Sequence, residues 1–421
     1  MRIVVKFGGT SIQNTERIEK AAQSIVKKIK EGNEVMVVVS AMGDTTDKLI
    51  SLLEGATKST YDRQDYNDFI SFGERMSAKL ISTALKTKGI KASVFDPSID
   101  NFPLITDSEN LIEANIVEAK SREQCQKILE PLLKDGAVPI VCGFLGRSIG
   151  EGKITTLGRG GSDITAFALG NFINADEVII VTDTPGVASA DPRLVKNVKT
   201  LPKISVEEMG IMADGGAKVL HPRALYYKNA NMKAKIINFQ NGDLSSKGTE
   251  IEGSFNSSIE IFPEKLCLLT FVGTQILETP GLLKKIILPL TKNRISLQGV
   301  ATGKSYIGVY LLEEHAKKAY DLVHPIILND CLLKSVSLKK DIALLILSSR
   351  NFIETPGIIE KIVKPLAENH INIIEMSTMK TDILLFVDWS NKDITSKLVN
   401  SAIVKLEANN SNGIYTNKFP E

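Results

Sequence analysis

The sequence of 421 residues has few of the features that mark several large classes of protein. Its four cysteines lie far apart and form no C-x-x-C pair, and its four histidines do not cluster with them. Neither a disulfide framework nor a zinc site is therefore indicated. No apolar run reaches the length of about 18 residues that a membrane-spanning helix needs, and the N-terminus begins with a strand pattern instead of a signal peptide. We expect a cytoplasmic protein.

The net charge is also small. Lys and Arg (51) nearly balance Asp and Glu (49), which leaves +2. No overall field therefore attracts nucleic acid or a lipid surface, and any bound anion must be held by local charge. The length is sufficient for two or three domains with separate cores.

Short β-branched runs alternate with amphipathic stretches over the first 240 or so residues. This alternation is typical of a mostly parallel sheet flanked by helices. Ligands of such sheets bind beyond the carboxyl ends of the strands, where the informative polar residues of this half are found. The expected strands are residues 4–7, 35–40, 137–141, 178–182 and 234–237, and the expected helices are residues 15–30, 65–87, 121–134, 163–172 and 206–212.

An internal repeat follows a polar, glycine-containing stretch at residues 241–253. Residues 278–286 recur 76 residues later as 354–362, and the register continues into the following segments. Each copy predicts a strand, a Pro-Gly turn, a helix, two strands, a helix and a final strand, which indicates a pair of small α+β modules rather than a solenoid. Duplication for stability alone is the alternative. The expected domains are residues 1–250, 264–338 and 339–421.

A first glycine loop follows the first predicted strand. Lys6 at the strand end faces Gly8 and Gly9, and Thr10 and Ser11 come next. Glycines let the backbone approach an anion, successive N–H groups form a concave donor surface, and a following helix adds its positive end. The lysine precedes the glycines, so this is not a P-loop. By itself the pattern fits either a phosphate site or a plain tight turn.

A second glycine loop precedes the predicted helix at 163–172. Gly158, Gly160 and Gly161 surround Arg159, whose guanidinium can bind a carboxylate or phosphate through two parallel hydrogen bonds. Either residue after these glycines, Ser162 or Asp163, can cap the helix. Two glycine loops with cations on one predicted sheet suggest a nucleotide and an anionic co-substrate.

Six segments occur in the order and approximate spacing of the aspartate kinases. They are KFGGTS (6–11), VSAM (39–42), FGE (72–74), TLGRGGSD (156–163), TDTPG (182–186) and GAKVLHP (216–222). The chain thus resembles this family over nearly its whole length, and its repeat is similar to the family's paired ACT regulatory modules. The resemblance implies an α/β amino-acid-kinase fold, a mostly parallel sheet sandwiched by helices, followed by two α+β ferredoxin-like ACT modules.

The resemblance also implies an activity, the ATP-dependent phosphorylation of the L-aspartate side-chain carboxylate to 4-phospho-L-aspartate. This is the first step of lysine, threonine and methionine biosynthesis. The acceptor is already ionised at neutral pH and needs no general base, so the obstacle is repulsion between two anions. The resemblance makes Lys6 and Asp163 catalytic: Lys6 supplies positive charge, and Asp163 orients Lys6 and the shell of the Mg²⁺ that the nucleotide carries.

The substrate and nucleotide contacts are also implied by the resemblance. Arg159 matches the residue for the α-carboxylate of aspartate and Glu74 the residue for its α-ammonium group, although Glu74 alone would pass for a surface charge. The other substrate contacts are Ser40, Ala41, Thr46, Phe144, Gly161 and Ser162, with Thr45 as an alternative to Thr46. The nucleotide contacts are Lys6, Gly8, Gly9, Thr10, Ser11, Thr182, Asp183, Arg193, Lys218 and Val219.

The sequence departs from the family in two places. Ala188 and Ser189 stand where many members have an aromatic residue beside the adenosine, which leaves the adenine packing open. Residues 301–305 lack the Thr-Ser-Glu run of lysine-sensing members, and Lys304 brings the opposite charge, so lysine, threonine, another effector or none stays open. Such modules pair between subunits, which implies a homodimer. The rival functions are the same fold with another carboxylate or phosphate acceptor, and a non-catalytic amino-acid sensor.

Overall fold

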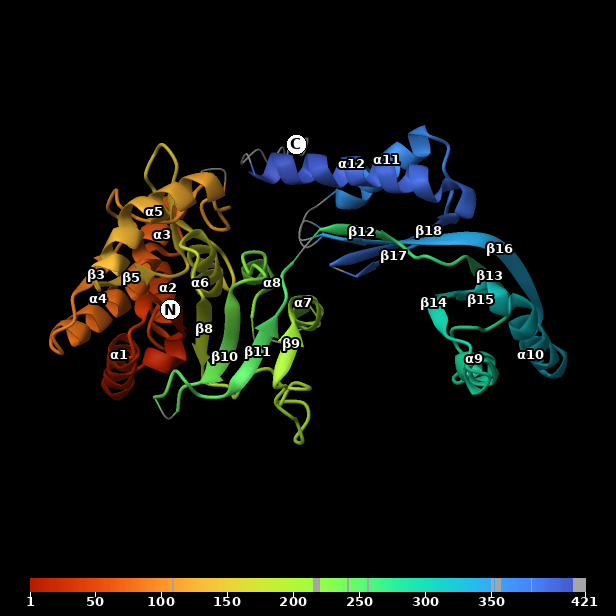
Figure 1. The fold of residues 1–421 in the computed structure, drawn as a ribbon, viewed down its shortest axis with the longest axis horizontal. Coiled ribbons are helices and arrows are strands. Elements are labelled where there is room, and N and C mark those ends of the chain that lie inside the picture. The colour runs from red at the N-terminus through yellow and green to blue at the C-terminus, as the bar shows by residue number, and fades with distance from the viewer. Residues whose placement is uncertain are drawn as a thin grey trace. The chain divides into compact units, whose positions relative to one another are not determined.

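The computed structural model describes residues 1–107, 110–214, 220–240, 242–255, 257–349, 352, 357–379 and 381–411. The chain forms two compact units, one built on Met1–Phe255 and the other on Asn256–Glu407 (Figure 1). Each unit has its own hydrophobic core, and the two are described separately.

An eight-stranded sheet forms the centre of the N-terminal unit, with the strand order β3-β5-β2-β1-β8-β10-β11-β9. All neighbouring strands are parallel except β10 and β11. The five strands expected from the sequence are confirmed. The strands are β1 (Arg2–Phe7), β2 (Glu34–Val39), β3 (Ala92–Phe95), β5 (Val138–Cys142), β8 (Glu177–Thr182), β9 (Lys203–Ser205), β10 (Lys233–Asn238) and β11 (Gly248–Glu252).

Strand β1 lies in the middle of this sheet between β2 and β8. Its last residue, Phe7, is paired with Val39 on one side and Val181 on the other. The strand residues at the centre are almost continuously apolar and buried, as expected for a parallel sheet covered on both faces. The loops that follow β1, β2 and β8 therefore leave the sheet at the same edge.

Eight helices surround the sheet in the described part of this unit (Figure 1). Helix α1 has the bounds expected from its periodicity. The expected single helix over 65–87 is wrong: two helices meet at Ser71, whose hydroxyl donates to the Asp68 carbonyl at 2.6 Å and competes with the helical ladder. The helices are α1 (Thr15–Lys30), α2 (Thr45–Thr57), α3 (Arg63–Ile70), α4 (Phe72–Lys86), α5 (Glu118–Lys134), α6 (Gly161–Phe172), α7 (Val206–Asp214) and α8 (Pro222–Leu225).

A small second sheet leads into the second glycine loop. It consists of β4 (Ile105–Thr106), β6 (Leu145–Ser148) and β7 (Ile154–Thr156), in the order β4-β6-β7. Strand β7 ends one residue before Leu157, and α6 begins at Gly161. The loop between them is thus anchored at one end by a sheet and at the other by a buried helix.

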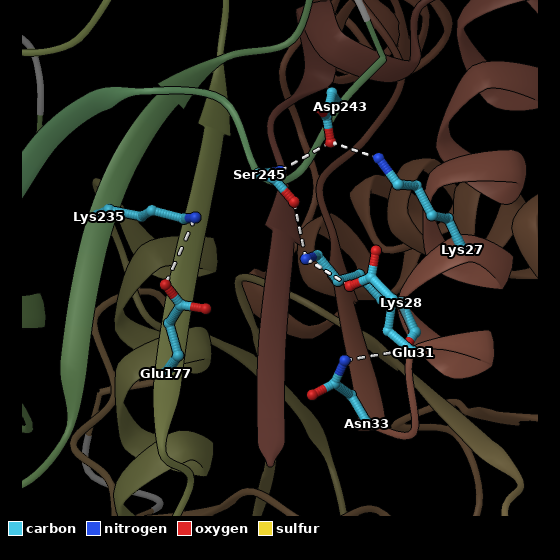
Figure 2. Close-up of polar contacts among 8 residues, drawn as sticks. All are labelled: Lys27, Lys28, Glu31, Asn33, Glu177, Lys235, Asp243 and Ser245. Atoms are coloured by element: carbon cyan, nitrogen blue, oxygen red, sulfur yellow. Dashed lines mark hydrogen bonds and ion pairs between the residues drawn. The ribbon is translucent and has the colours of Figure 1, made fainter.

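The connection from β10 to β11 is fixed to helix α1. Lys27 Nζ lies 3.4 Å from Asp243 Oδ1, and Lys28 Nζ donates to Ser245 Oγ at 2.8 Å (Figure 2). Exposed pairs of this kind are each worth at most about 1 kcal/mol. They therefore fix the path of this connection more than they stabilise the fold.

The C-terminal unit is one seven-stranded sheet with helices, and the repeat is visible in its element order. The main path of the sheet is β14-β15-β13-β16-β18-β17, and β12 pairs with β16 off this path. The strands are β12 (Ser258–Ile261), β13 (Leu266–Gly273), β14 (Leu297–Gly303), β15 (Tyr306–Leu312), β16 (Leu333–Ser348), β17 (Ile373–Met379) and β18 (Asp382–Asp388). The helices are α9 (Leu282–Lys292), α10 (Ala316–Asn329), α11 (Ile358–Glu368) and α12 (Lys392–Ser411).

The two copies share local detail. Helices α9 and α11 both follow a glycine in the left-handed region, Gly281 at φ 82° and Gly357 at φ 78°. Both helices contain a proline whose carbonyl accepts a 2.9 Å hydrogen bond from the side chain of an asparagine four residues later. The same sequence pattern has therefore produced the same helix twice.

The connection between the copies differs from the expectation of separate strands. The last strand of the first copy and the first strand of the second are one strand, β16, of 16 residues. Its second half also pairs with β12, since Ser258 lies opposite Ser348. The second half of the sheet thus includes a strand that precedes the first copy, an arrangement that no local pattern indicates.

Candidate active site

A cavity of about 310 Å³ lies at the carboxyl ends of β1 and β2. Parallel sheets place their ligands at this edge. The lining comes from five separate parts of the sequence and includes most of the residues predicted to bind substrate. The lining residues are Lys6, Ser40, Thr46, Glu74, Phe144, Gly158, Arg159, Gly160, Gly161, Ser162 and Asp163.

Lys6 and Asp163 form an ion pair in the cavity. Lys6 Nζ lies 2.6 Å from Asp163 Oδ1, and the two side chains are 12% and 13% exposed. Lys6 comes from the central strand and Asp163 from the first turn of α6, where the helix dipole also favours a carboxylate. The pair holds the lysine ammonium group beside both loops, since Asp163 follows the second glycine loop and a Cβ on Gly8 of the first would lie 3.7 Å from Lys6 Nζ.

The expectation that Ser162 or Asp163 caps helix α6 is wrong. The cap position is Gly160, at φ 72°, and it makes no side-chain cap bond. The backbone N–H of Asp163 donates to the Gly160 carbonyl at 2.9 Å, and the Asp163 carboxylate pairs with Lys6. The left-handed glycine ends the loop by itself, which leaves the aspartate side chain available to the cavity.

Glu74 is a buried carboxyl group with one oxygen left over. It is 4% exposed, and its Oε1 accepts a hydrogen bond from the Ala41 backbone N–H at 3.1 Å. Its Oε2 is buried without a hydrogen-bond partner among the described residues. Burial raises the pKa of Glu74 to about 7. A cationic group that entered the cavity would satisfy this oxygen and favour the ionised form.

Arg159 supplies the opposite charge at the same cavity. It is exposed and has no ion-pair partner among the residues that the structure describes. Arg159 and Glu74 come from different elements, the second glycine loop and α4, yet they line one cavity. A free cation and a half-satisfied carboxylate together form a site of the kind that binds an amino-acid zwitterion.

Phe144 has a strained backbone beside the cavity, with φ 68° in the region that glycine normally occupies. Its backbone N–H donates to Thr165 Oγ1 at 3.2 Å. Gly161 packs against it so closely that an added Cβ would lie 2.7 Å from the Phe144 ring. Strain of this kind clusters at functional sites.

The structure separates the two candidate threonines. Thr46 lines the cavity, whereas the Thr45 hydroxyl donates to the Met42 carbonyl at 2.6 Å. The Thr45 hydroxyl thus serves the start of α2. Gly158 and Gly160 also line the cavity, although we assigned them no contact. Their positions in the glycine loop before α6 could have indicated that they line the cavity.

The first glycine loop is packed tightly against its neighbours. The Gly8 N–H donates to the Val181 carbonyl at 3.1 Å, and a Cβ on Gly9 would lie 2.5 Å from the Ala41 carbonyl oxygen. Ser11 is 2% exposed, and its hydroxyl points to the same Val181 carbonyl at 3.4 Å. The buried Ser11 side chain therefore helps to fix the turn to β8, whereas Thr10 is exposed.

The other predicted nucleotide contacts lie in different surroundings. Thr182 ends β8 and Asp183 follows it at the same sheet edge, and the Asp183 carbonyl accepts a 2.9 Å hydrogen bond from Asn238 Nδ2. We did not predict a role for Asn238, although its place at the end of β10 was a signal. Arg193 is paired with Asp191 at 2.7 Å and is not part of the cavity lining. The remaining two, Lys218 and Val219, lie outside the described residues.

Two family models match the chain. The amino acid kinase family model covers residues 1–238, and an ACT domain model covers residues 337–396. Aspartokinase 2 of Bacillus subtilis is 31% identical over 397 residues, which span 90% of this chain and 92% of that protein. The chain belongs to the aspartokinase family. Its kinase activity and its fold, an amino-acid-kinase domain followed by an ACT region, are confirmed as predicted.

Solved structures of aspartokinases agree with this assignment. The aspartate kinase of Synechocystis superposes with a TM-score of 0.74 at 28% identity, over 96% of this chain and 69% of that one. E. coli aspartokinase III, solved in complex with aspartate and ADP, shares the fold with a TM-score of 0.55 at 22% identity, over 96% of this chain and all of that one.

Two general properties complete the description of the site and the chain. Within the described ranges, no group of three or more His, Cys, Asp or Glu side chains is arranged to hold a metal ion. None of the described helices is both long and apolar enough to cross a membrane.

Proposed function

We propose that the cavity binds L-aspartate and that the chain transfers the γ-phosphoryl group of ATP to its side-chain carboxylate, giving 4-phospho-L-aspartate. The observation that carries this proposal is the presence of opposite charges in one cavity. Arg159 has no ion-pair partner among the described residues, Glu74 is half-satisfied among them, and both lie next to the Lys6–Asp163 ion pair. The complex of E. coli aspartokinase III with aspartate and ADP supports the same two ligands here.

The two charges give each end of the amino acid a partner. The Arg159 guanidinium binds the α-carboxylate through parallel hydrogen bonds, and Glu74 Oε2 accepts from the α-ammonium group. Ser40, Ala41, Thr46, Phe144, Gly161 and Ser162 complete the substrate contacts. With both ends of the backbone held, the side-chain carboxylate of aspartate is directed toward Lys6.

Phosphoryl transfer in this site requires positive charge and alignment. The acceptor is already an anion, so no residue needs to remove a proton. Lys6 neutralises charge on the phosphoryl group as it passes between two anions, and Asp163 holds the lysine in place. Asp163 thus acts as an orienting group and not as a base.

Mg²⁺ fits this site as an ion that arrives with the nucleotide. It is usually held by one or two carboxylates together with phosphate oxygens and water, and Asp163 offers one carboxylate. When bound, Mg²⁺ supplies charge neutralisation on the phosphates.

The nucleotide occupies the edge where the loops after β1 and β8 meet. The hydrogen bond from the Gly8 N–H to the Val181 carbonyl brings these loops together, and the adjacent backbone N–H groups of Gly9 and Thr10 are the donors for phosphate. Thr182 and Asp183 contact the adenosine. Arg193, Lys218 and Val219 are further nucleotide contacts in this proposal.

The C-terminal unit acts as the regulatory part. Residues 264–338 and 339–421 form two ACT modules after a kinase domain at 1–250, and they bind an amino-acid effector, lysine or threonine, and pair subunits into a homodimer. The ACT match at 337–396 and the repeated element order support this division. The enzyme then works in the cytoplasm at the first step of lysine, threonine and methionine biosynthesis.

A trapping assay tests the proposed reaction. Incubation with ATP, Mg²⁺, L-aspartate and hydroxylamine should yield aspartyl hydroxamate, because hydroxylamine captures an acyl phosphate. Asp163→Ala serves as the inactive control. If wild type makes no more hydroxamate than this control, the proposed function is wrong.

A further inference from the structure

Arg223 contacts the loop that carries Arg159 without lining the cavity. It lies on helix α8, and its Nη1 donates to the Leu157 carbonyl at 3.1 Å. Its Nη2 lies 3.4 Å from the Ala114 carbonyl. Leu157 and Ala114 are both fully buried, so their carbonyls depend on donors from the protein. One guanidinium therefore connects the start of the loop to a neighbouring segment.

Besides Arg223, backbone bonds hold the ends of the loop: the Leu157 N–H donates to the Phe144 carbonyl at 2.8 Å, and the Gly161 N–H donates to the Gly158 carbonyl at 3.0 Å. Gly158 and Gly160 have φ angles of 73° and 72°, and they have no side chains to anchor them. Arg159 itself is exposed between these two glycines. The position of its guanidinium thus depends on how firmly the ends of the loop are fixed.

Helix α8 is placed to fix the loop. A Cβ on Gly160 would lie 2.2 Å from the Cβ of His221, the cap residue of α8, so loop and helix are in close backbone contact. On the other side, the Ala114 N–H donates to the Thr156 carbonyl at 2.9 Å. Arg223 of α8 thus connects two neighbouring segments, because its guanidinium donates to the carbonyls of Leu157 and Ala114.

We propose that Arg223 is a positioning residue for aspartate binding, which acts through the Leu157 carbonyl to hold Arg159 at the cavity. This inference rests on the proposed role of Arg159 in binding the α-carboxylate. Misplacement of a binding group by about 1 Å can cost up to about 100-fold in rate. Loss of Arg223 should therefore weaken aspartate binding while leaving the nucleotide loops unchanged.

The test compares Arg223→Ala with a matched control, Arg122→Ala. Arg122 is also partly buried and donates to the carbonyl and the side chain of a single residue, Asn171, at 3.3 and 2.7 Å. It contacts the far end of α6 rather than the loop. Arg223→Ala should raise the aspartate KM roughly tenfold with the ATP KM within about twofold, whereas Arg122→Ala should change neither.

Two further arms keep the test decisive. Arg223→Lys retains a donor for one carbonyl and should give an intermediate aspartate KM; it replaces the alanine variant if that protein does not fold. Amide hydrogen exchange at residues 157–161 should be faster in either Arg223 variant than in wild type or Arg122→Ala. This readout needs no activity, so it tests the inference even if wild type does not use aspartate.

The proposal is overturned if the Arg223 variants keep the wild-type aspartate KM, or if exchange at residues 157–161 is unchanged. It is also overturned if Arg122→Ala raises the aspartate KM to the same extent, because the effect would then be a general loss of stability. Absence of hydroxamate from wild type alone counts against the proposed reaction and not against the role of Arg223 in holding the loop.

Discussion

Two regions of the molecule bury a polar side chain: the cavity of the N-terminal unit buries Glu74, and the contact between the two repeat copies in the C-terminal unit buries Tyr310. The two regions differ in whether that side chain has a polar partner. At the contact, burial raises the pKa of Tyr310, and the neighbouring Glu375 carboxylate raises it further as an acceptor for the Tyr310 hydroxyl. In the cavity, Glu74 Oε2 has no partner among the described residues. Buried polar groups are normally paired. An unpaired one that lines a cavity therefore marks the place where a ligand completes the structure.

The contact between the copies also shows how a duplicated sequence has diverged. Tyr310 and Phe386 occupy equivalent positions 76 residues apart and stack on each other, with ring centroids 4.0 Å apart. The equivalent of Glu375 is Gly299, where a Cβ would lie 3.2 Å from the Phe386 ring. The first copy thus contributes the Tyr310 hydroxyl and the space beside Gly299. The second copy contributes the Glu375 carboxylate and the Phe386 ring.

The largest expected effect comes from Lys6→Ala, which breaks the cavity at its ion pair. Loss of one group that stabilises a developing charge costs about 100- to 1,000-fold in kcat. The Asp163 carboxylate is also left without its partner. Initial rates with varied aspartate and ATP measure this effect. A change confined to the aspartate KM would contradict the assignment of Lys6 to the transferring phosphoryl group.

Arg159→Ala should have the next largest effect. A hydrogen bond to a charged group is worth about 1.5–3 kcal/mol, so kcat/KM for aspartate should fall by about 10- to 100-fold. Arg193→Ala is the contrasting variant, because Arg193 is paired with Asp191 and does not line the cavity. It should alter only the ATP KM. Equal effects of both variants on aspartate would refute the separation of the two sites.

The pH dependence sharpens the comparison, because burial raises the pKa of the unsatisfied carboxyl into the neutral range. Burial raises the pKa of Glu74 from 4.5 to about 7 in the ligand-free protein. A raised folded-state pKa gives a stabilising contribution that is complete below the unfolded-state pKa and lost as the pH rises through about 7. Glu74→Gln cannot ionise, so its Tm should rise relative to wild type over this window.

The ionisation of Glu74 should also affect aspartate binding. The α-ammonium group of aspartate favours ionised Glu74, so the wild-type aspartate KM should fall as the pH rises through about 7. Glu74→Gln should lack this trend, and the exposed control Glu123→Gln should retain it. Thermal unfolding and initial rates across this range provide the two measurements. Identical pH profiles for wild type and Glu74→Gln would rule out Glu74 as the group involved.

The pair in the C-terminal unit should have the smallest effect on catalysis, because its loss changes stability and not turnover. Tyr310→Phe leaves Glu375 without the hydroxyl and should lower the free energy of unfolding of the C-terminal unit by about 1.5–3 kcal/mol. Tyr320→Phe is the control, since the Tyr320 hydroxyl donates only to the neutral Val336 carbonyl at 3.2 Å and should cost about 1 kcal/mol. Denaturant unfolding measures both. Neither variant should change aspartate turnover without effector, and a large change in kcat would contradict a purely structural role.

The sequence was sufficient to predict most of the residues that line the cavity, because family motifs mark them and they lie at a strand end, at a helix start or beside a glycine loop. Lys6, Glu74 and Arg159 lie 68 to 153 residues apart, and they come to one cavity from β1, from the first turn of α4 and from the loop between β7 and α6. The bounds of α1 were predictable for a similar reason, since its periodicity and its Asn14 cap are local. The family motifs then supplied roles that spacing alone could not.

What could not be predicted depends on contacts between distant segments. Strand β12 pairs with β16, although the whole first repeat copy lies between them in the sequence. The hydrogen bond from Arg223 to the Leu157 carbonyl requires α8 to lie beside the second glycine loop. The missed helix cap has a different origin. Gly160 takes the left-handed conformation by itself, so a capping residue that looked available was used for the ion pair.

The central claim is that the cavity reads both charges of an amino acid, and the choice between L-aspartate and N-acetyl-L-aspartate as acceptor tests it most directly. Acetylation removes the α-ammonium charge that Glu74 binds in the proposed function, and it leaves the reacting carboxylate intact. The account predicts that wild type favours aspartate in kcat/KM by about 100-fold or more, and that Glu74→Gln reduces this preference by about tenfold or more. Equal use of both acceptors by wild type, or an undiminished preference in Glu74→Gln, would contradict it.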